Sequence, residues 1–118
     1  MQQERRQAKR VRVYLPMQIH APGAGHPVET LTKDISGAGL RCVSPSVTPV
    51  STEVGLDVVF SSGAEQLSAR GKTVWFRTIP DSEQFDLGIA FVGLSDHDRR
   101  RLSVYIDHLS SKSSPVST

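Results

Sequence analysis

The sequence predicts a mainly β protein: a six-stranded antiparallel β-barrel with one C-terminal α-helix. Three observations favour this fold class. Apolar residues alternate with polar ones in several short runs, which is typical of half-buried strands. Turn signals rich in Gly, Pro, Ser and Asp separate these runs at intervals of about 8 to 12 residues. Helical spacing of apolar residues occurs only near the C-terminus, and 118 residues are near the size of one domain.

The first predicted strand covers residues 11–19, where every second position is apolar. Pro16 faces outward in this pattern and has no backbone N–H, so we expect an edge or a bulge there. The segment "APGAGHP" at 21–27 then predicts a turn. Residues 28–33 form the second predicted strand.

Four further runs predict the remaining strands. The third strand contains Leu40 and Cys42, and the other three cover residues 56–60, 66–76 and 85–91. The apolar phase shifts inside the run 66–76, which predicts a β-bulge near Gly71.

The predicted helix follows the last strand. Ser95 has the character of an N-cap, with the acidic Asp98 three residues later, as in a capping box. Four apolar positions then recur at helical spacing: Leu102, Tyr105, Ile106 and Leu109. We therefore expect a barrel with its helix over residues 11–109, and a polar, disordered tail over residues 110–118.

Positive charge is concentrated in a basic arm, residues 1–10, and continues into the first strand. The net charge is only +2, yet five cationic residues stand among the first dozen: Arg5, Arg6, Lys9, Arg10 and Arg12. A solvated tail is the simplest interpretation of such a run, and an anionic ligand is the alternative. Three arginines at 99–101 form a second run, for which solvated helix surface is favoured over a second anion site.

Other features limit the possible functions. No run approaches the ~18 apolar residues of a membrane span, and the single Cys42 fits a small buried hydrophobe in a reducing compartment, so we expect a cytoplasmic location. His97 and His108 are too far apart along a helix to share a metal, and no metal site is predicted. No hydrolase or phosphate-loop motif is present, so we expect no enzymatic activity and no cofactor.

Two motifs flank the first strand and its turn. The segment "RRQAKR" contains Arg5, Arg6 and Arg10, and "DISGAG" contains Asp34, Ser36 and Gly39. The second motif alone is also typical of an Asx turn. The two in this order resemble the motifs of PilZ domains, the family of bacterial cyclic di-GMP receptors, and the likeness extends from about residue 4 to residue 109.

The resemblance implies a single-domain cyclic di-GMP receptor and a role for each motif residue. The arginines would bind phosphates and guanine edges, Asp34 would accept from guanine N1 and N2, Ser36 would add a hydroxyl contact, and Gly39 would leave room at the turn. Arginine suits this ligand because its planar fork binds phosphate, donates to guanine and stacks on purines. Trp75 is a possible stacking residue, although a rim or core aromatic is an equal alternative.

The predicted mechanism is an arginine arm that is mobile when free and folds over the ligand, which changes the surface offered to an unknown protein partner. Lys9 and Arg12 are expected to supply general positive potential only. Two alternatives stay open. The same barrel could be a protein-interaction module independent of the nucleotide, or a small nucleic-acid-binding barrel, which the low net charge disfavours.

Overall fold

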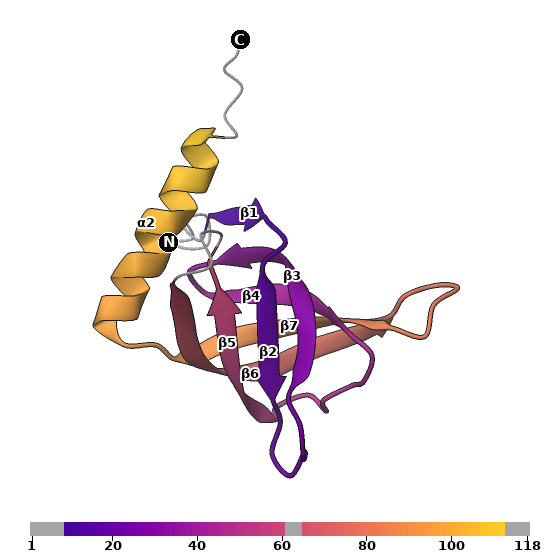
Figure 1. Ribbon diagram of the computed structural model, residues 1–118. Helices are drawn as coiled ribbons and strands as arrows, with labels where there is room; N and C mark the ends of the chain where they lie inside the picture. The colour runs from indigo at the N-terminus through magenta and orange to yellow at the C-terminus, as the bar shows by residue number, and fades with distance from the viewer. Residues whose placement is uncertain (1–8, 61–64, 113–118) are drawn as a thin grey trace, which may run out of the picture.

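A computed structural model describes residues 9–60 and 65–112 of the chain (Figure 1). The strands that follow the arm are β1 (Arg10–Arg12), β2 (Pro16–His20), β3 (Val28–Ser36), β4 (Gly39–Ser44), β5 (Glu53–Val59), β6 (Gln66–Thr78) and β7 (Phe85–Gly93). The helix α2 (Asp96–Lys112) ends the described part.

The strands close into a barrel. The order β3-β2-β5-β6-β7-β4 returns to β3 through a β3–β4 pairing, and every pairing is antiparallel. The short β1 pairs with the C-terminal end of β3, and β2 pairs with the N-terminal half of the same edge of β3. β1 and β2 thus act as one interrupted strand of a closed six-stranded barrel, and the predicted fold class is confirmed.

The strand predicted over residues 11–19 is interrupted between β1 and β2, directly before Pro16, where an edge or a bulge was predicted. Thr32, which is fully buried, inserts its hydroxyl at the break, where it accepts from the Leu15 N–H (2.9 Å) and donates to the Val13 carbonyl (2.5 Å). A side chain thereby replaces regular ladder bonds. Pro16, which has no N–H, begins β2 directly after this bulge-like irregularity.

The core lies inside the barrel and beneath the helix. It consists of alternate residues of the six strands, with Leu102 and Ile106 of α2 covering one opening. The N-cap prediction is confirmed, since Ser95 Oγ accepts from the Asp98 N–H at 3.0 Å. The helix runs to Lys112, whereas the predicted disordered tail began at residue 110. Within the described residues, no helix is long and apolar enough to cross a membrane.

β6 contains two irregularities in its pairing with β7. The register with β7 shifts between Arg70 and Gly71, which confirms the predicted bulge. A second shift, between Thr73 and Trp75, leaves Val74 out of the pairing. Val74 and Trp75 are consecutive and both exposed, although consecutive residues of a regular strand face opposite sides. The second bulge was not predicted. Val74, Trp75 and Phe76 are all exposed in this part of β6, where both faces of the strand are open.

Candidate functional site

A buried carboxylate lies between two arginines on the outer face of the barrel. Arg10 Nη1 donates to Asp34 Oδ1 at 2.5 Å. Arg41 approaches the other oxygen side-on, with Nε at 3.0 Å and Nη2 at 2.9 Å from Oδ2. The Asp34 side chain is only 9% exposed, against 51% for Arg10 and 30% for Arg41. A buried carboxylate requires such partners, because an unpaired charge out of water is costly.

Strand pairing explains why these residues meet. β3 is paired on one edge with β1 and on the other with β4, so Asp34 lies opposite Arg12 on one side and Arg41 on the other. Outward-facing residues of neighbouring strands come within side-chain reach at such positions. The cluster therefore joins the first motif, on β1, to the second motif, at the end of β3.

A cavity of about 460 Å³ opens beside this cluster. Arg10, Asp34 and Arg41 line one side, and Val74 and Trp75 line another. The remaining lining consists of four small residues, Ala38, Gly39, Gly88 and Ala90, and of two core residues, Leu40 and Ile89. The cavity is thus lined by cations, one carboxylate, an aromatic ring and a surface of small residues.

Trp75 lines this cavity and packs its indole against Gly88. A Cβ at Gly88, its partner in the β6–β7 ladder, would overlap the indole ring. Arg77 places its guanidinium 5.8 Å from the centre of the same ring, within cation–π range. The indole is 39% exposed, so Trp75 is a rim aromatic with surface free for stacking.

Ser36 and Gly39 shape the turn between β3 and β4. Ser36 is fully buried; its hydroxyl accepts from the Ala38 N–H (3.1 Å) and donates to the Gly39 carbonyl (3.3 Å). A Cβ at Gly39 would collide with the Ile89 carbonyl of β7, so a glycine lets β4 and β7 approach closely. Both residues therefore shape the backbone beside the site. Their predicted contacts with the ligand stay predictions.

The arm enters the described part of the chain at Lys9; Arg5 and Arg6 lie outside it. Lys9 Nζ is 3.5 Å from Asp107 Oδ1 of α2, and both side chains are exposed, so this pair is weak. Arg10, the next residue, contacts Asp34. Consecutive cations of the arm thus contact the helix and the carboxylate cluster.

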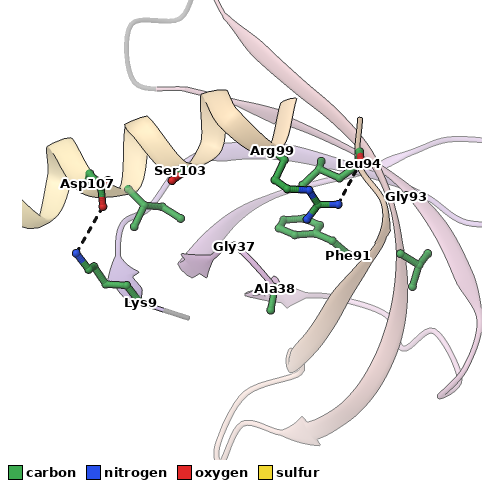
Figure 2. A pocket seen from close by; sticks show the side chains of 11 residues that line it. Lys9, Gly37, Ala38, Phe91, Gly93, Leu94, Arg99, Ser103 and Asp107 are labelled. Atoms are coloured by element: carbon green, nitrogen blue, oxygen red, sulfur yellow. Dashed lines mark hydrogen bonds and ion pairs between the residues drawn. The ribbon is translucent and has the colours of Figure 1, made fainter. Parts of the chain in front are cut away.

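A second, larger cavity of about 940 Å³ lies between α2, the end of β7 and the β3–β4 turn. Figure 2 shows Lys9 paired with Asp107 at one side of it, and Arg99 next to Phe91 at the other. Ala38 lines both cavities, so they adjoin at the β3–β4 turn. Of the three arginines at 99–101, only Arg99 lines this cavity.

Another ionic cluster lies on the same outer face, around Asp86, which is two residues before Gly88 on β7. Asp86, 5% exposed, accepts from Lys33 Nζ at 2.9 Å and from Arg77 Nη2 at 3.1 Å. Burial opposes ionisation, but these two hydrogen bonds and charges hold the pKa of Asp86 below its ordinary value. Inside the barrel, burial and the Asp86 charge raise the pKa of the Cys42 thiol to about 12, which fits its predicted role as a small hydrophobe.

Two residues of the site were missed from the sequence. Arg41 stands between the core residues Leu40 and Cys42 and has the pattern of an ordinary outward strand residue. Gly88 has no local signal at all. Each is placed by strand pairing: Arg41 lies opposite Asp34, and Gly88 lies opposite Trp75. The β3–β4 turn is short enough that a hairpin register could have indicated Arg41 opposite Asp34.

A comparison with protein families identifies the family to which the chain belongs. The family model described as the PilZ domain matches residues 4–108, nearly the whole chain. The chain belongs to the PilZ family. This family match covers the arm, the site and the helix together. A search of curated proteins finds no match to this PilZ domain.

Solved structures show the same fold. The inhibitor of motility MotI/DgrA from Bacillus subtilis superposes with a TM-score of 0.80 at 17% identity, over 92% of this chain and 53% of that one. The PilZ domain of YcgR from Escherichia coli, solved with c-di-GMP, gives 0.71 at 15% identity, over 92% and 93%. The PilZ domain of CeSA from a cellulose-synthesizing bacterium gives 0.64 at 14%, over 87% and 99%. The chain thus spans about half of MotI/DgrA but nearly all of the two isolated PilZ domains.

Proposed function

We propose that this PilZ domain is a cyclic di-GMP receptor that binds the nucleotide at the cluster of Arg10 and Asp34. The observation that carries the proposal is their direct contact at the edge of a cavity that also contains Trp75. A ligand with two phosphodiesters and two guanines needs cations, a carboxylate acceptor and a stacking surface. All three are present within one cavity.

Each residue has a role that suits its chemistry. Arg10 binds a phosphate or the O6 and N7 edge of guanine, because guanidinium forms forked hydrogen bonds with both. Asp34 accepts from guanine N1–H and N2–H, because an ionised carboxylate has only acceptors to offer to these two donors. Trp75 stacks on a base, an interaction of about 1 to 3 kcal/mol. Arg5 and Arg6 add phosphate contacts from the arm, and Ser36 and Gly39 complete the loop.

Binding proceeds by exchange at the Asp34 carboxylate. Arg10 holds Oδ1 through one contact, and about half of its side chain is exposed. A guanine edge that takes over Oδ1 keeps the buried carboxylate paired while it frees the Arg10 guanidinium for the ligand's phosphate. The phosphates then neutralise the arm, so ligand binding favours an arm closed over the cavity.

The signal is carried by the surface that this closure changes. Lys9 contacts α2, so movement of the arm alters the contact between arm and helix. A protein partner reads the altered surface, and the domain itself is a receptor without catalytic activity in the cytoplasm. The solved structures of YcgR, with c-di-GMP, and of MrkH, described as a c-di-GMP-dependent transcription regulator, support the ligand class for this fold.

Isothermal titration calorimetry with cyclic di-GMP tests the proposal, with GMP and a short DNA oligonucleotide as controls. We expect saturable binding of cyclic di-GMP, much weaker binding of GMP, and affinity that falls with added salt because phosphate contacts are charge-driven. Absence of binding at ~100 μM, where about 5 kcal/mol of recognition is measurable, would overturn it and favour the protein-interaction module. Tighter binding of the oligonucleotide would favour the nucleic-acid-binding barrel.

A further inference from the structure

Arg41 and Arg10 share the two oxygens of Asp34 unequally. Arg10 reaches Oδ1 with one nitrogen, whereas Arg41 places two nitrogens, Nε and Nη2, on Oδ2. The Nε–H group donates a hydrogen bond to Oδ2, and Nη2 adds an ion-pair contact to the same oxygen. Arg41 therefore holds Oδ2, and Arg10 holds Oδ1.

The backbones that carry the two arginines also differ. Arg10 is the first residue of the three-residue β1, which pairs with β3. Arg41 is in the middle of β4, which is paired along one edge with β3 and along the other with β7. Arg41 is also the less exposed, at 30% against 51%. If a ligand displaces one arginine from Asp34, Arg10 is the one that leaves and Arg41 is the one that stays.

We propose that Arg41 is a positioning residue that sets the selectivity of the site for guanine; this rests on the proposed function. With Oδ2 held by Arg41, Oδ1 keeps a fixed position at the edge of the cavity. Once Arg10 leaves, the two lone pairs of Asp34 Oδ1 accept from guanine N1–H and N2–H. Hypoxanthine has the same N1–H but lacks the N2 amine, so it loses half of this recognition.

Without Arg41 the carboxylate turns about its Cα–Cβ and Cβ–Cγ bonds and is satisfied by water. Its acceptor is then no longer aimed at the exocyclic amine. The loss is specific for the guanine base, because cyclic di-GMP and cyclic di-IMP, the inosine analogue, carry the same two phosphodiesters. General loss of positive charge weakens both ligands equally, and only loss of orientation changes their ratio.

The experiment measures calorimetric affinities of both cyclic dinucleotides for the wild type, Arg41→Ala and Arg41→Gln. We expect the wild type to prefer cyclic di-GMP by about tenfold, the size of one charge-assisted hydrogen bond. Either variant should lose most of this preference, with the cyclic di-GMP affinity falling more than that of cyclic di-IMP. Arg41→Gln keeps much of the side-chain bulk, so it decides the question should Arg41→Ala fail to fold.

Arg70→Ala is the matched control. Arg70 is another strand arginine in an ion pair, 3.1 Å from Glu53, so its removal changes the net charge by the same amount as the removal of Arg41. It lines neither of the two adjoining cavities. It should leave the ratio of the two affinities unchanged. A wild-type ratio in Arg41→Gln would overturn the role of Arg41 and leave the receptor proposal standing. A wild type that binds neither dinucleotide would overturn the proposed function itself.

Discussion

Two buried carboxylates on the same face of the barrel make an informative comparison. Asp34 and Asp86 are 9% and 5% exposed, and each is held by two cationic side chains from other strands. Asp34 lines the cavity that contains Trp75 and Gly88. Asp86 lines neither this cavity nor the larger one that adjoins it.

The difference lies in what surrounds each ion pair. A paired buried carboxylate is by itself weak evidence of function, because burial alone demands partners. Next to Asp34, small residues leave space and an aromatic ring borders it, so a ligand can replace one of its partners. Asp86 has Lys33 and Arg77 fixed across β3, β7 and β6, which ties three strands together. We therefore propose ligand recognition as the role of the first cluster and stability as the role of the second.

The largest expected effect is on ligand binding by Arg10 variants. Arg10→Ala should lower the affinity for cyclic di-GMP by about a hundredfold, because it removes a forked, charge-assisted contact. Arg10→Lys should not restore it, since an ammonium cannot reproduce the fork. Calorimetry measures both variants. Stability should change by less than about 1 kcal/mol, as expected of a half-exposed ion pair.

An Arg10→Lys variant with wild-type affinity would contradict this role. It would show that Arg10 acts only as a point charge, and the exchange at Asp34 would lose its basis.

The next effect is on the stability contributed by Asp86. Asp86→Asn should lower the free energy of unfolding by about 1 to 3 kcal/mol at neutral pH, because two charge-assisted hydrogen bonds weaken. The pKa of Asp86 is lowered in the folded state, so the unfolded chain binds the proton more readily. The stability from the ionised group is therefore complete above the ordinary pKa of about 4 and is lost as the pH falls through the lowered value.

Urea denaturation of wild type and Asp86→Asn between pH 7 and pH 2.5 measures this dependence. The difference between the two proteins should be largest at pH 7 and should shrink below about pH 4. A difference that stays constant over this range would mean that the charge of Asp86 contributes nothing to folding.

The smallest of these effects concerns Trp75, which connects the two clusters through its cation–π contact with Arg77. Trp75→Ala should reduce affinity by about tenfold, within the range of one stacked base, and Trp75→Phe should retain part of it. Trp75 is the only tryptophan in the chain, so its fluorescence reports on the site directly. Ligand should change the emission of the wild type; an unchanged spectrum at saturating cyclic di-GMP would exclude stacking.

Local patterns in the sequence predicted much of this fold. Alternation indicated the core side of β2, β4, β5 and β7, the Ser95 cap indicated the helix start, and the phase shift near Gly71 indicated a bulge. An irregularity at Pro16 was predicted, but the hydroxyl of Thr32 that bonds across the break was not. For such features the decisive partner lies on another strand.

The same reason limits what could be predicted of the site. Asp34 and Arg10 were found because their motifs resemble those of a known family, and the structure brings them into contact. Arg41 and Gly88 belong to the site only through strand register, which a single sequence indicates poorly. Ser36 was found by its motif, yet its hydroxyl is occupied within the turn.

A direct test of the central claim is the affinity of Asp34→Ala and Asp86→Ala for cyclic di-GMP, measured side by side by calorimetry on folded protein. Asp34→Ala should lose at least about tenfold, because the guanine edge loses its acceptor. Asp86→Ala should stay within about fivefold of the wild type, although it is the less stable of the two. Equal losses in both variants, or a larger loss in Asp86→Ala, would contradict the division between a carboxylate that recognises ligand and one that stabilises the barrel.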